Sequence, residues 1–210
     1  MTKKGILKEI LDTKIVAIIR LPSSAPVFNT AMALKEGGIK AIEITMGTPN
    51  ALGEIEKLAK QEGVLTGVGS VTDPQMVEEA INAGAQYIVT PATQKAVIQK
   101  AHNMGKPVLS GALSPTEILQ AYQWGADIIK LFPANIFGMP YFKAVKAPMP
   151  DIPIMPTGGI TIENAAEWLS AGAVALGVGS TLVNKQLIDK NDFKAITQIA
   201  IHMRNAVENR

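Results

Sequence analysis

Hydrophobic residues in this chain gather in short runs separated by longer segments in which apolar positions recur at helical spacing. The short runs predict strands at 14–20, 40–45, 64–68, 87–90, 107–110, 127–132, 152–155 and 174–176. The longer segments are typical of amphipathic helices, because one face of a helix is apolar when hydrophobic residues recur every three or four positions. We therefore expect strands and helices to alternate along the chain.

The predicted helices begin and end at recognisable residues. Their ranges are 3–12, a segment ending at 36, one opening at 48–49, one opening at 73–74, 94–104, one opening at 114–115, 139–147, 162–171 and a C-terminal helix from about 191. Asp73 precedes Pro74 and Ser114 precedes Pro115, and a capping side chain before a proline is a common helix start.

Eight alternating units favour one particular fold class. Alternation of strands and helices predicts an α/β fold with a parallel sheet. The 210 residues are used up by these units, with no stretch left for a second domain. We therefore expect a single-domain (β/α)8 TIM barrel over residues 1–210, with an extra N-terminal helix.

An internal repeat supports this fold, because a glycine ends the predicted helix before every second strand. These glycines are Gly38, Gly84, Gly125 and Gly172. They recur at intervals of roughly 40 to 50 residues, which is the length of two βα units. The residue five places after each glycine is, in order, Glu43, Val89, Lys130 and Gly177. If the four units are equivalent, these side chains share one register in the sheet.

This register has a consequence for the predicted second and sixth strands, which lie opposite one another in such a barrel. Side chains from alternate strands form layers inside a barrel, so Glu43 and Lys130 should both point inward near its C-terminal mouth. A buried carboxylate and ammonium are a poor choice for stability alone. A structural ion pair is one alternative, and a general acid/base beside a nucleophilic amine is the other.

Lys130 lies in the apolar run Asp127–Phe132. A lysine is unusual there, because lysine is seldom fully buried unless it forms an ion pair or takes part in the chemistry of the protein. Burial favours the neutral amine of a lysine, and the neutral amine can attack a carbonyl to form a Schiff base. The alternative is a lysine on an edge strand, with its stem buried and its ammonium group reaching water.

Composition excludes several other classes of protein. The net charge is +2 and the charges are dispersed, with no basic block of the kind that binds nucleic acid or an anionic membrane. The chain has no cysteine, so disulfides, thiolate metal sites and a cysteine nucleophile are excluded. His102 and His202 have no companion at metal-ligand spacing, and we expect no metal and no cofactor.

No apolar run approaches the roughly 18 residues of a membrane span, and the N-terminus lacks the pattern of a signal peptide. We therefore expect a cytoplasmic protein.

Two glycine-rich turns follow the predicted seventh and eighth strands. They are Gly158-Gly159 and Gly177-Val178-Gly179-Ser180. Barrels often bind phosphate at this place through backbone N–H groups, and Ser180 would add a hydroxyl. Ordinary turn chemistry is the alternative. The similar turn Gly67-Val68-Gly69-Ser70 follows the third strand, and there we favour contact with substrate over phosphate.

Arg20 ends the first predicted strand. A guanidinium suits a substrate carboxylate because it donates two parallel hydrogen bonds. A salt bridge at the rim of the barrel is an equally open alternative from position alone.

Taken together, six segments resemble the bacterial 2-keto-3-deoxy-6-phosphogluconate / 4-hydroxy-2-oxoglutarate aldolase family over nearly the whole chain. They are Ala41-Ile42-Glu43-Ile44-Thr45, Gly67-Val68-Gly69-Ser70-Val71, Val89-Thr90-Pro91, Ile129-Lys130-Leu131-Phe132-Pro133-Ala134, Pro156-Thr157-Gly158-Gly159-Ile160 and Gly177-Val178-Gly179-Ser180. The lysine followed by Phe-Pro, with Pro-Thr-Gly-Gly downstream, is the most specific part.

The resemblance implies a metal-free class I aldolase that acts on a small 2-keto acid, usually as a homotrimer. By that resemblance, Lys130 forms the Schiff base with pyruvate and Glu43 moves protons. The implied substrate-binding residues are Arg20, Ser70, Thr90, Pro91, Phe132 and Thr157, and the implied phosphate-binding residues are Gly158, Gly159, Gly179 and Ser180. Many members carry an arginine where this chain has Gly47, so the carboxylate role passes to Arg20.

Two rival functions remain open at this point. A phosphate-binding barrel isomerase or transferase would use Lys130 only as a cation, without a covalent step. A barrel that survives as a non-enzymatic assembly subunit would have no reason to keep both Glu43 and Lys130. The sequence does not rank a phosphorylated sugar acid against 4-hydroxy-2-oxoglutarate as the substrate.

Overall fold

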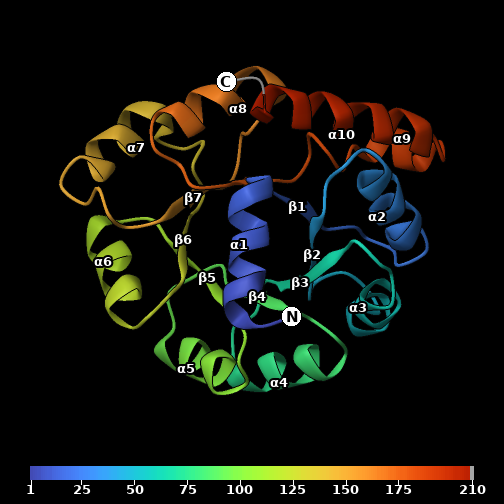
Figure 1. Cartoon of the computed structure of the whole chain (residues 1–210). Coiled ribbons are helices and arrows are strands. Elements are labelled where there is room, and N and C mark those ends of the chain that lie inside the picture. Colours follow the sequence, from blue (N-terminus) through green and yellow to red (C-terminus); the bar gives the residue numbers. More distant parts are fainter. Residues whose placement is uncertain (209–210) are drawn as a thin grey trace.

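The computed structural model describes residues 1–208, and its centre is a parallel sheet of eight strands that closes on itself (Figure 1). The strands are β1 (Ile15–Ile19), β2 (Ala41–Thr45), β3 (Leu65–Gly69), β4 (Tyr87–Val89), β5 (Val108–Ala112), β6 (Ile128–Leu131), β7 (Ile154–Pro156) and β8 (Leu176–Val178). They pair in chain order from β1 to β7, and β8 pairs with β1. A bridge between Thr157 and Gly177 joins the two remaining edges. The predicted (β/α)8 barrel is therefore confirmed.

Residues 1–208 contain ten helices, most of which form a ring around the barrel (Figure 1). They are α1 (Lys3–Thr13), α2 (Val27–Glu36), α3 (Ala51–Ala59), α4 (Pro74–Asn82), α5 (Lys95–Asn103), α6 (Pro115–Gln123), α7 (Gly138–Lys146), α8 (Ile162–Ser170), α9 (Lys185–Asp189) and α10 (Phe193–Glu208). Asp73 caps α4 by accepting hydrogen bonds from the backbone N–H groups of Gln75 and Met76. Ser114 caps α6 in a capping box with Glu117.

Several boundaries differ from the sequence-based expectation by a few residues, and one short helix was not expected. The last strand covers 176–178 rather than 174–176, because its pairing with β1 begins where Ile15 lies opposite Leu176. The third helix begins at Ala51, after Asn50 adopts a left-handed conformation with φ of 55°. The short helix α9 was not predicted at all, because five residues are too few for a hydrophobic period to be recognised.

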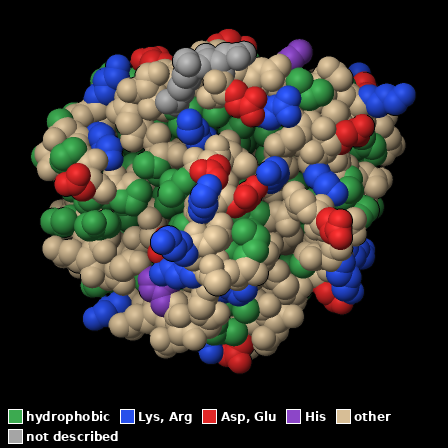
Figure 2. Space-filling model, in the orientation of Figure 1, with side chains coloured by type: hydrophobic (Ala, Val, Ile, Leu, Met, Phe, Trp, Pro, Cys, Tyr) green, Lys and Arg blue, Asp and Glu red, His purple; other side chains and the backbone are tan. Residues whose placement is uncertain are grey.

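Helix α1 closes the N-terminal end of the barrel and crosses that opening in Figure 1. Its Ile6 and Ile10 are fully buried against the inward-facing side chains of the strands. Those inward-facing side chains are Val16, Ala41, Leu65, Tyr87, Val89, Leu109, Ile128, Met155 and Ala175. The opposite face of α1 carries charges of both signs (Figure 2). Its Lys8 and Asp12 form an ion pair. The barrel interior is therefore apolar at this end and accessible only from the other.

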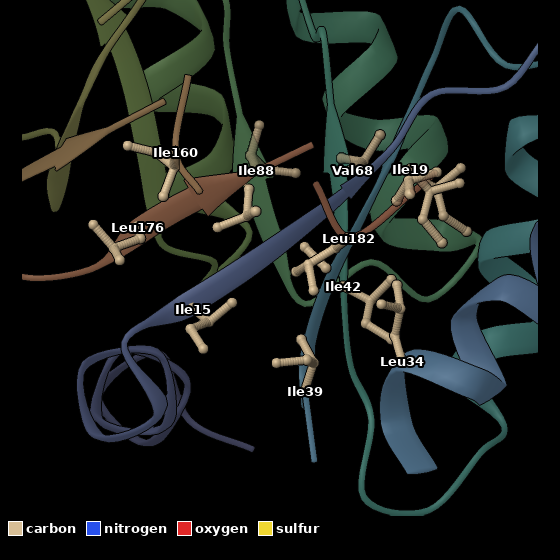
Figure 3. Close-up of a cluster of buried hydrophobic side chains, with 14 of the residues drawn as sticks. Ile15, Ile19, Leu34, Ile39, Ile42, Val68, Ile88, Ile160, Leu176 and Leu182 are labelled. Carbon is tan, nitrogen blue, oxygen red and sulfur yellow. The ribbon is translucent and has the colours of Figure 1, made fainter. Parts of the chain in front are cut away.

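A second, larger apolar cluster lies between the strands and the surrounding helices (Figure 3). Ile15 and Ile19 of β1 belong to it, whereas Val16 between them faces the barrel interior. This alternation is the period of two that a strand imposes on its side chains. Leu34 of α2 projects toward the strands and packs in the same cluster as Ile42. The strands read as continuous apolar runs because both of their faces are buried.

None of the helices within residues 1–208 combines the length and the apolar character that crossing a membrane requires.

Candidate active site

Glu43 and Lys130 meet inside the barrel. Glu43 is on β2 and is completely buried, and Lys130 is on β6 with 5% of its surface exposed. Lys130 Nζ lies 3.8 Å from Glu43 Oε1. The inward direction of both side chains, which the glycine repeat predicted, is confirmed. The separation is too long for a hydrogen bond, so the pair differs from the short, hydrogen-bonded ion pairs that stabilise protein interiors.

Gly69 on β3 provides the space for the carboxylate of Glu43. Position 69 pairs with Thr45 on β2, two residues beyond Glu43. A Cβ atom on residue 69 would lie 1.7 Å from Glu43 Oε1 and 2.4 Å from its carboxyl carbon. Any side chain here would displace the carboxylate, so this glycine serves close packing rather than an unusual backbone angle.

The carboxylate of Glu43 has few compensating contacts. Neither of its oxygens has a hydrogen-bond partner among the described residues. Burial raises the pKa of Glu43, while the positive charges of Lys130 and, less strongly, Arg20 lower it. Because the effect of burial is the larger, the net shift favours the protonated acid. A carboxyl group with a raised pKa beside an amine is suited to accepting and returning protons near neutral pH.

A cavity of about 370 Å³ opens above this pair at the C-terminal end of the strands. It is lined by Ile18, Arg20, Lys130, Phe132, Thr157, Gly158, Gly159, Ile160, Gly177, Gly179, Ser180, Val183 and Lys185. Three of the lining residues are cationic and none is acidic. The cavity therefore suits a small molecule with more than one anionic group.

The two glycine-rich turns lie together at one side of the cavity. Gly158 and Gly159 have φ angles of 104° and 71°, which glycine adopts at little cost. A Cβ atom on Gly159 would lie 2.7 Å from Asn135 Cβ, so the segment after β6 packs directly against this turn. Gly179 and Ser180 also line the cavity, and the bridge between Thr157 and Gly177 brings their turn next to this one. The structure thus brings the four predicted phosphate-binding residues into one place.

Arg20 lies at the rim of the cavity, directly after β1. Its Nη2 atom donates a hydrogen bond to Ser70 Oγ over 3.2 Å. Ser70 follows β3 and has a positive φ of 59°. Among residues 1–208, Arg20 has no carboxylate partner within ion-pair distance. The guanidinium is therefore exposed, held by a neutral hydroxyl and directed at the cavity mouth.

The other predicted substrate-binding residues occupy different positions. Phe132 and Thr157 line the cavity, and Lys130 Nζ lies 5.4 Å from the centre of the Phe132 ring. Thr157 Oγ1 is buried and has no hydrogen-bond partner among the described atoms. Thr90 and Pro91 do not belong to the cavity lining. The Thr90 hydroxyl donates to Ala92 O and accepts from the backbone N–H of Gly111, so it supports the backbone beside the site.

Lys185 is a cavity residue that the sequence interpretation missed. It is the first residue of α9, and its ammonium pairs with Asp189 at 2.6 Å. A signal was present, because Asn184 is a good capping residue directly before Lys185 and follows Ser180 closely. Ile18, Ile160 and Val183, which form apolar walls of the cavity, were also missed because they resemble ordinary core residues.

No group of three or more His, Cys, Asp or Glu side chains in residues 1–208 is placed to hold a metal ion. The chemistry that this arrangement offers is that of an amine and a carboxyl group facing each other in an apolar barrel below a cationic cavity. Those groups suit covalent attack on a carbonyl with nearby proton transfer.

Comparison with known proteins points in the same direction. The family model described as KDPG and KHG aldolase matches residues 6–199. The 2-dehydro-3-deoxy-phosphogluconate aldolase of Pseudomonas aeruginosa is 34% identical over 199 residues, covering 94% of this chain and 89% of the relative. The 2-dehydro-3-deoxy-6-phosphogalactonate aldolase of Escherichia coli is 35% identical over 171 residues, covering 80% of this chain and 83% of the relative.

A solved structure shows the same similarity in three dimensions. The structure of KDPG aldolase from Legionella pneumophila superposes with a TM-score of 0.84 at 27% identity, covering 90% of this chain and 93% of that one. In that structure pyruvate was captured at low pH as a covalent carbinolamine intermediate.

Proposed function

The chain belongs to the KDPG and KHG aldolase family and is a class I aldolase, a carbon–carbon lyase, and we propose that Lys130 is its Schiff-base lysine and Glu43 its general acid/base. The proposed reaction is the reversible cleavage of 2-keto-3-deoxy-6-phosphogluconate to pyruvate and glyceraldehyde 3-phosphate, of 4-hydroxy-2-oxoglutarate to pyruvate and glyoxylate, or of both. The observation that carries this proposal is the buried approach of Lys130 Nζ to Glu43 Oε1, at 3.8 Å and without a hydrogen bond.

The first half of the reaction builds an electron sink on Lys130. Transfer of a proton from the Lys130 ammonium to Glu43 leaves both groups uncharged, which a low-dielectric barrel interior favours. The free amine adds to the C2 carbonyl of the substrate to give a carbinolamine. Loss of water, with a proton supplied by Glu43, then gives a protonated imine. The imine draws electrons from the C3–C4 bond.

The second half breaks the carbon–carbon bond. Ionised Glu43 accepts the proton of the C4 hydroxyl, either directly or through a water molecule. The electron pair of the C3–C4 bond moves into the imine, which becomes a neutral enamine, and the aldehyde departs. Protonated Glu43 then returns its proton to C3 of the enamine. Water adds to the resulting imine and releases pyruvate from Lys130.

The cavity supports the proposed orientation of the substrate. Arg20 with Ser70 offers hydrogen bonds to the carboxylate at the pyruvyl end. The backbone N–H groups near Gly158, Gly159 and Gly179, together with Ser180, suit a phosphate at the far end. Phe132 and Thr157 line the same cavity near Lys130 and would flank the reacting carbons. Thr90 and Pro91, which the resemblance assigns to substrate binding, follow β4, and the hydroxyl of Thr90 is bonded to the backbone of Ala92 and Gly111.

We also propose that the enzyme works in the cytoplasm as a homotrimer. Phosphorylated sugar acids are strongly anionic and are retained inside cells, which favours the cytoplasm. The resemblance to the family supports the trimer, as does a surface on α6 and the segment before α7 that exposes Leu119, Tyr122, Ile136 and Phe137. Green side chains gather over α6 in Figure 2. Light scattering would then give three times the chain mass of 22.3 kDa, whereas a value equal to one chain mass would reject the trimer.

Steady-state assays of pyruvate release test the proposed reaction. The purified chain is supplied with each of the two substrates, and pyruvate is measured with lactate dehydrogenase. Turnover of at least one substrate, unaffected by a chelator, is the expected result. Absence of pyruvate from both substrates, for a folded protein, would overturn the proposed function.

A further inference from the structure

Tyr87 is a second polar side chain inside the barrel, and the mechanism above does not use it. It is completely buried on β4, among the apolar residues that α1 covers. Its hydroxyl group has no hydrogen-bond partner among the described residues. An unpaired buried hydroxyl is costly, and phenylalanine would fill the same space without that cost. The hydroxyl of Tyr87 therefore calls for an explanation beyond packing.

The strand register places Tyr87 in one row with Glu43. Glu43 of β2 lies opposite Gly67 of β3, and Gly67 lies opposite Tyr87 of β4. Residues paired in this way on neighbouring strands point to the same side of a sheet. Glu43 and Tyr87 therefore both face the barrel interior, on either side of a residue that has no side chain.

The ring of Tyr87 crosses Gly67 in the direction of Glu43. A Cβ atom on Gly67 would lie 2.1 Å from Tyr87 Cζ, the ring carbon that carries the hydroxyl. The corresponding position on Gly69 would be 1.7 Å from Glu43 Oε1. These glycines are two residues apart on β3, so their positions are separated by about 6–7 Å. The hydroxyl end of the ring and the carboxylate thus lie over adjacent parts of one strand.

The electrostatic effects agree with this placement. Burial raises the pKa of Tyr87 well above its ordinary value, and the negative charge of Glu43 raises it further. The phenol therefore keeps its proton at every pH at which the enzyme would work, and it remains a hydrogen-bond donor. The titratable groups that act on Glu43 are Lys130 from β6 and Arg20 at the end of β1, with Tyr87 as the neighbour on β4.

We propose that Tyr87 is a positioning residue for Glu43: its hydroxyl donates a hydrogen bond, directly or through one water molecule, to the ionised carboxylate during turnover. This inference rests on the proposed function, because it assigns Tyr87 a task only if Glu43 is the general base. No hydrogen bond joins the two side chains in this structure, so the contact belongs to the state in which Glu43 is charged.

The reaction creates a need for such a donor. Glu43 is ionised while Lys130 carries the protonated imine, and at the 3.8 Å that separates Lys130 Nζ from Glu43 Oε1 the lysine nitrogen forms no hydrogen bond with the carboxylate. Arg20 is exposed at the rim and acts on Glu43 less strongly than Lys130 does. A hydrogen bond to a charged group is among the stronger contacts available in a protein interior. Tyr87 would supply this hydrogen bond from the end of the barrel that α1 covers, away from the cavity in which the substrate binds.

The test compares Tyr87→Phe with Thr66→Val. Tyr87→Phe keeps the ring against Gly67 and removes only the hydroxyl. Thr66 is on β3 beside Gly67, and its buried hydroxyl also lacks a partner, but its side chain points to the outer face of the sheet. We expect Tyr87→Phe to lower kcat about 3- to 10-fold with an unchanged KM, since a contact to the charged base is lost. Thr66→Val should match the wild type.

The pH profile separates a positioning role from a structural one. Loss of a donor destabilises the ionised carboxylate, so the pKa of Glu43 rises and the acidic limb of kcat moves to higher pH by about 0.5–1 unit. A wild-type kcat and acidic limb in Tyr87→Phe would overturn the proposal.

Trapping with pyruvate and borohydride is run in parallel on both proteins, and Tyr87→Phe should still form the adduct on Lys130. If the wild type forms none, the proposed function fails and the role of Tyr87 falls with it. If both proteins form the adduct and have the same pH profile, only the role of Tyr87 fails.

Discussion

The carboxylate of Glu43 occupies the space in which residue 69 would carry a side chain. A Cβ atom on Gly69 would lie only 1.7 Å from Glu43 Oε1, and a contact below 3.0 Å requires one of the partners to move. Because Glu43 is fixed from the neighbouring strand and is completely buried, the proposed acid/base depends on a glycine that performs no chemistry.

Gly69→Ala should therefore reduce kcat by about 100-fold or more, since a displacement of about 1 Å in a catalytic group costs this much. Steady-state kinetics of pyruvate release measure the effect. The matched control is Gly47→Ala, because a Cβ atom on Gly47 would meet nothing within 4 Å. Equal activity of the two variants would mean that the position of Glu43 is unimportant for turnover.

The Glu43–Lys130 pair should cost stability rather than provide it. Replacing a buried ion pair by apolar side chains of similar size is often stabilising by about 1–4 kcal/mol. The double variant Glu43→Met/Lys130→Met should therefore unfold at a higher urea concentration than the wild type, with no aldolase activity. A double variant that is clearly less stable would favour the alternative in which the pair is a structural salt bridge.

The acidic limb of the pH profile of kcat should lie at a higher pH than the ordinary pKa of a glutamic acid. Burial raises the pKa of Glu43, and Lys130 and Arg20 only partly oppose this. The base must be ionised to accept the proton of the C4 hydroxyl, so activity falls as the pH drops through this raised value. Kinetics over the acid range measure the limb, and a limb at the position of an ordinary, exposed glutamate would contradict the assignment.

Arg20→Ala should raise KM for pyruvyl substrates by about 10- to 100-fold, the effect of losing hydrogen bonds between charged groups. Arg20→Lys should recover only part of this, because lysine cannot donate two parallel hydrogen bonds. Arg20→Ala should also move the acidic limb of kcat to slightly higher pH, since the charge of Arg20 lowers the pKa of Glu43. Unchanged kinetics in Arg20→Ala would exclude a role in binding the carboxylate.

Lys185 should distinguish the two substrates by the anionic group opposite the pyruvyl end, which is a phosphate in one and a carboxylate in the other. It shares the cavity with Ser180 and Gly179, where a phosphate is proposed to bind. We expect Lys185→Ala to raise KM for the phosphorylated sugar acid about 5- to 10-fold and to affect 4-hydroxy-2-oxoglutarate less, because the dianionic phosphate loses the larger attraction. Lys143→Ala on α7 removes the same charge outside the cavity and serves as control. Equal effects on both substrates would refute this selectivity.

Much of the fold followed from the sequence because both faces of the strands are buried and glycines mark the ends of the helices. The repeat that aligned Glu43 with Lys130 correctly predicted that both point into the barrel. The start of β8 was misplaced because the apolar run from Ala173 to Val178 offers no polar residue at which a boundary could be recognised.

The site was less predictable wherever it depends on contacts between distant segments. Lys185 enters the cavity through α9, which is too short to leave a periodic pattern. Tyr87 looked like one more strand residue, and only the pairing of β2, β3 and β4 puts it in a row with Glu43. Thr90 was expected to face substrate, but its hydroxyl is used by the backbone of Ala92 and Gly111.

The central claim is that the amine of Lys130 forms a covalent bond with the substrate. Incubation with pyruvate and borohydride, followed by mass spectrometry of peptides, tests this claim most directly. The account predicts a reduced pyruvyl adduct on Lys130, lost in Lys130→Ala together with cleavage activity, while the variant remains folded. Absence of an adduct on the folded wild-type chain, in conditions that trap a control class I aldolase, would contradict the covalent mechanism and favour a barrel that binds phosphorylated substrates without an imine.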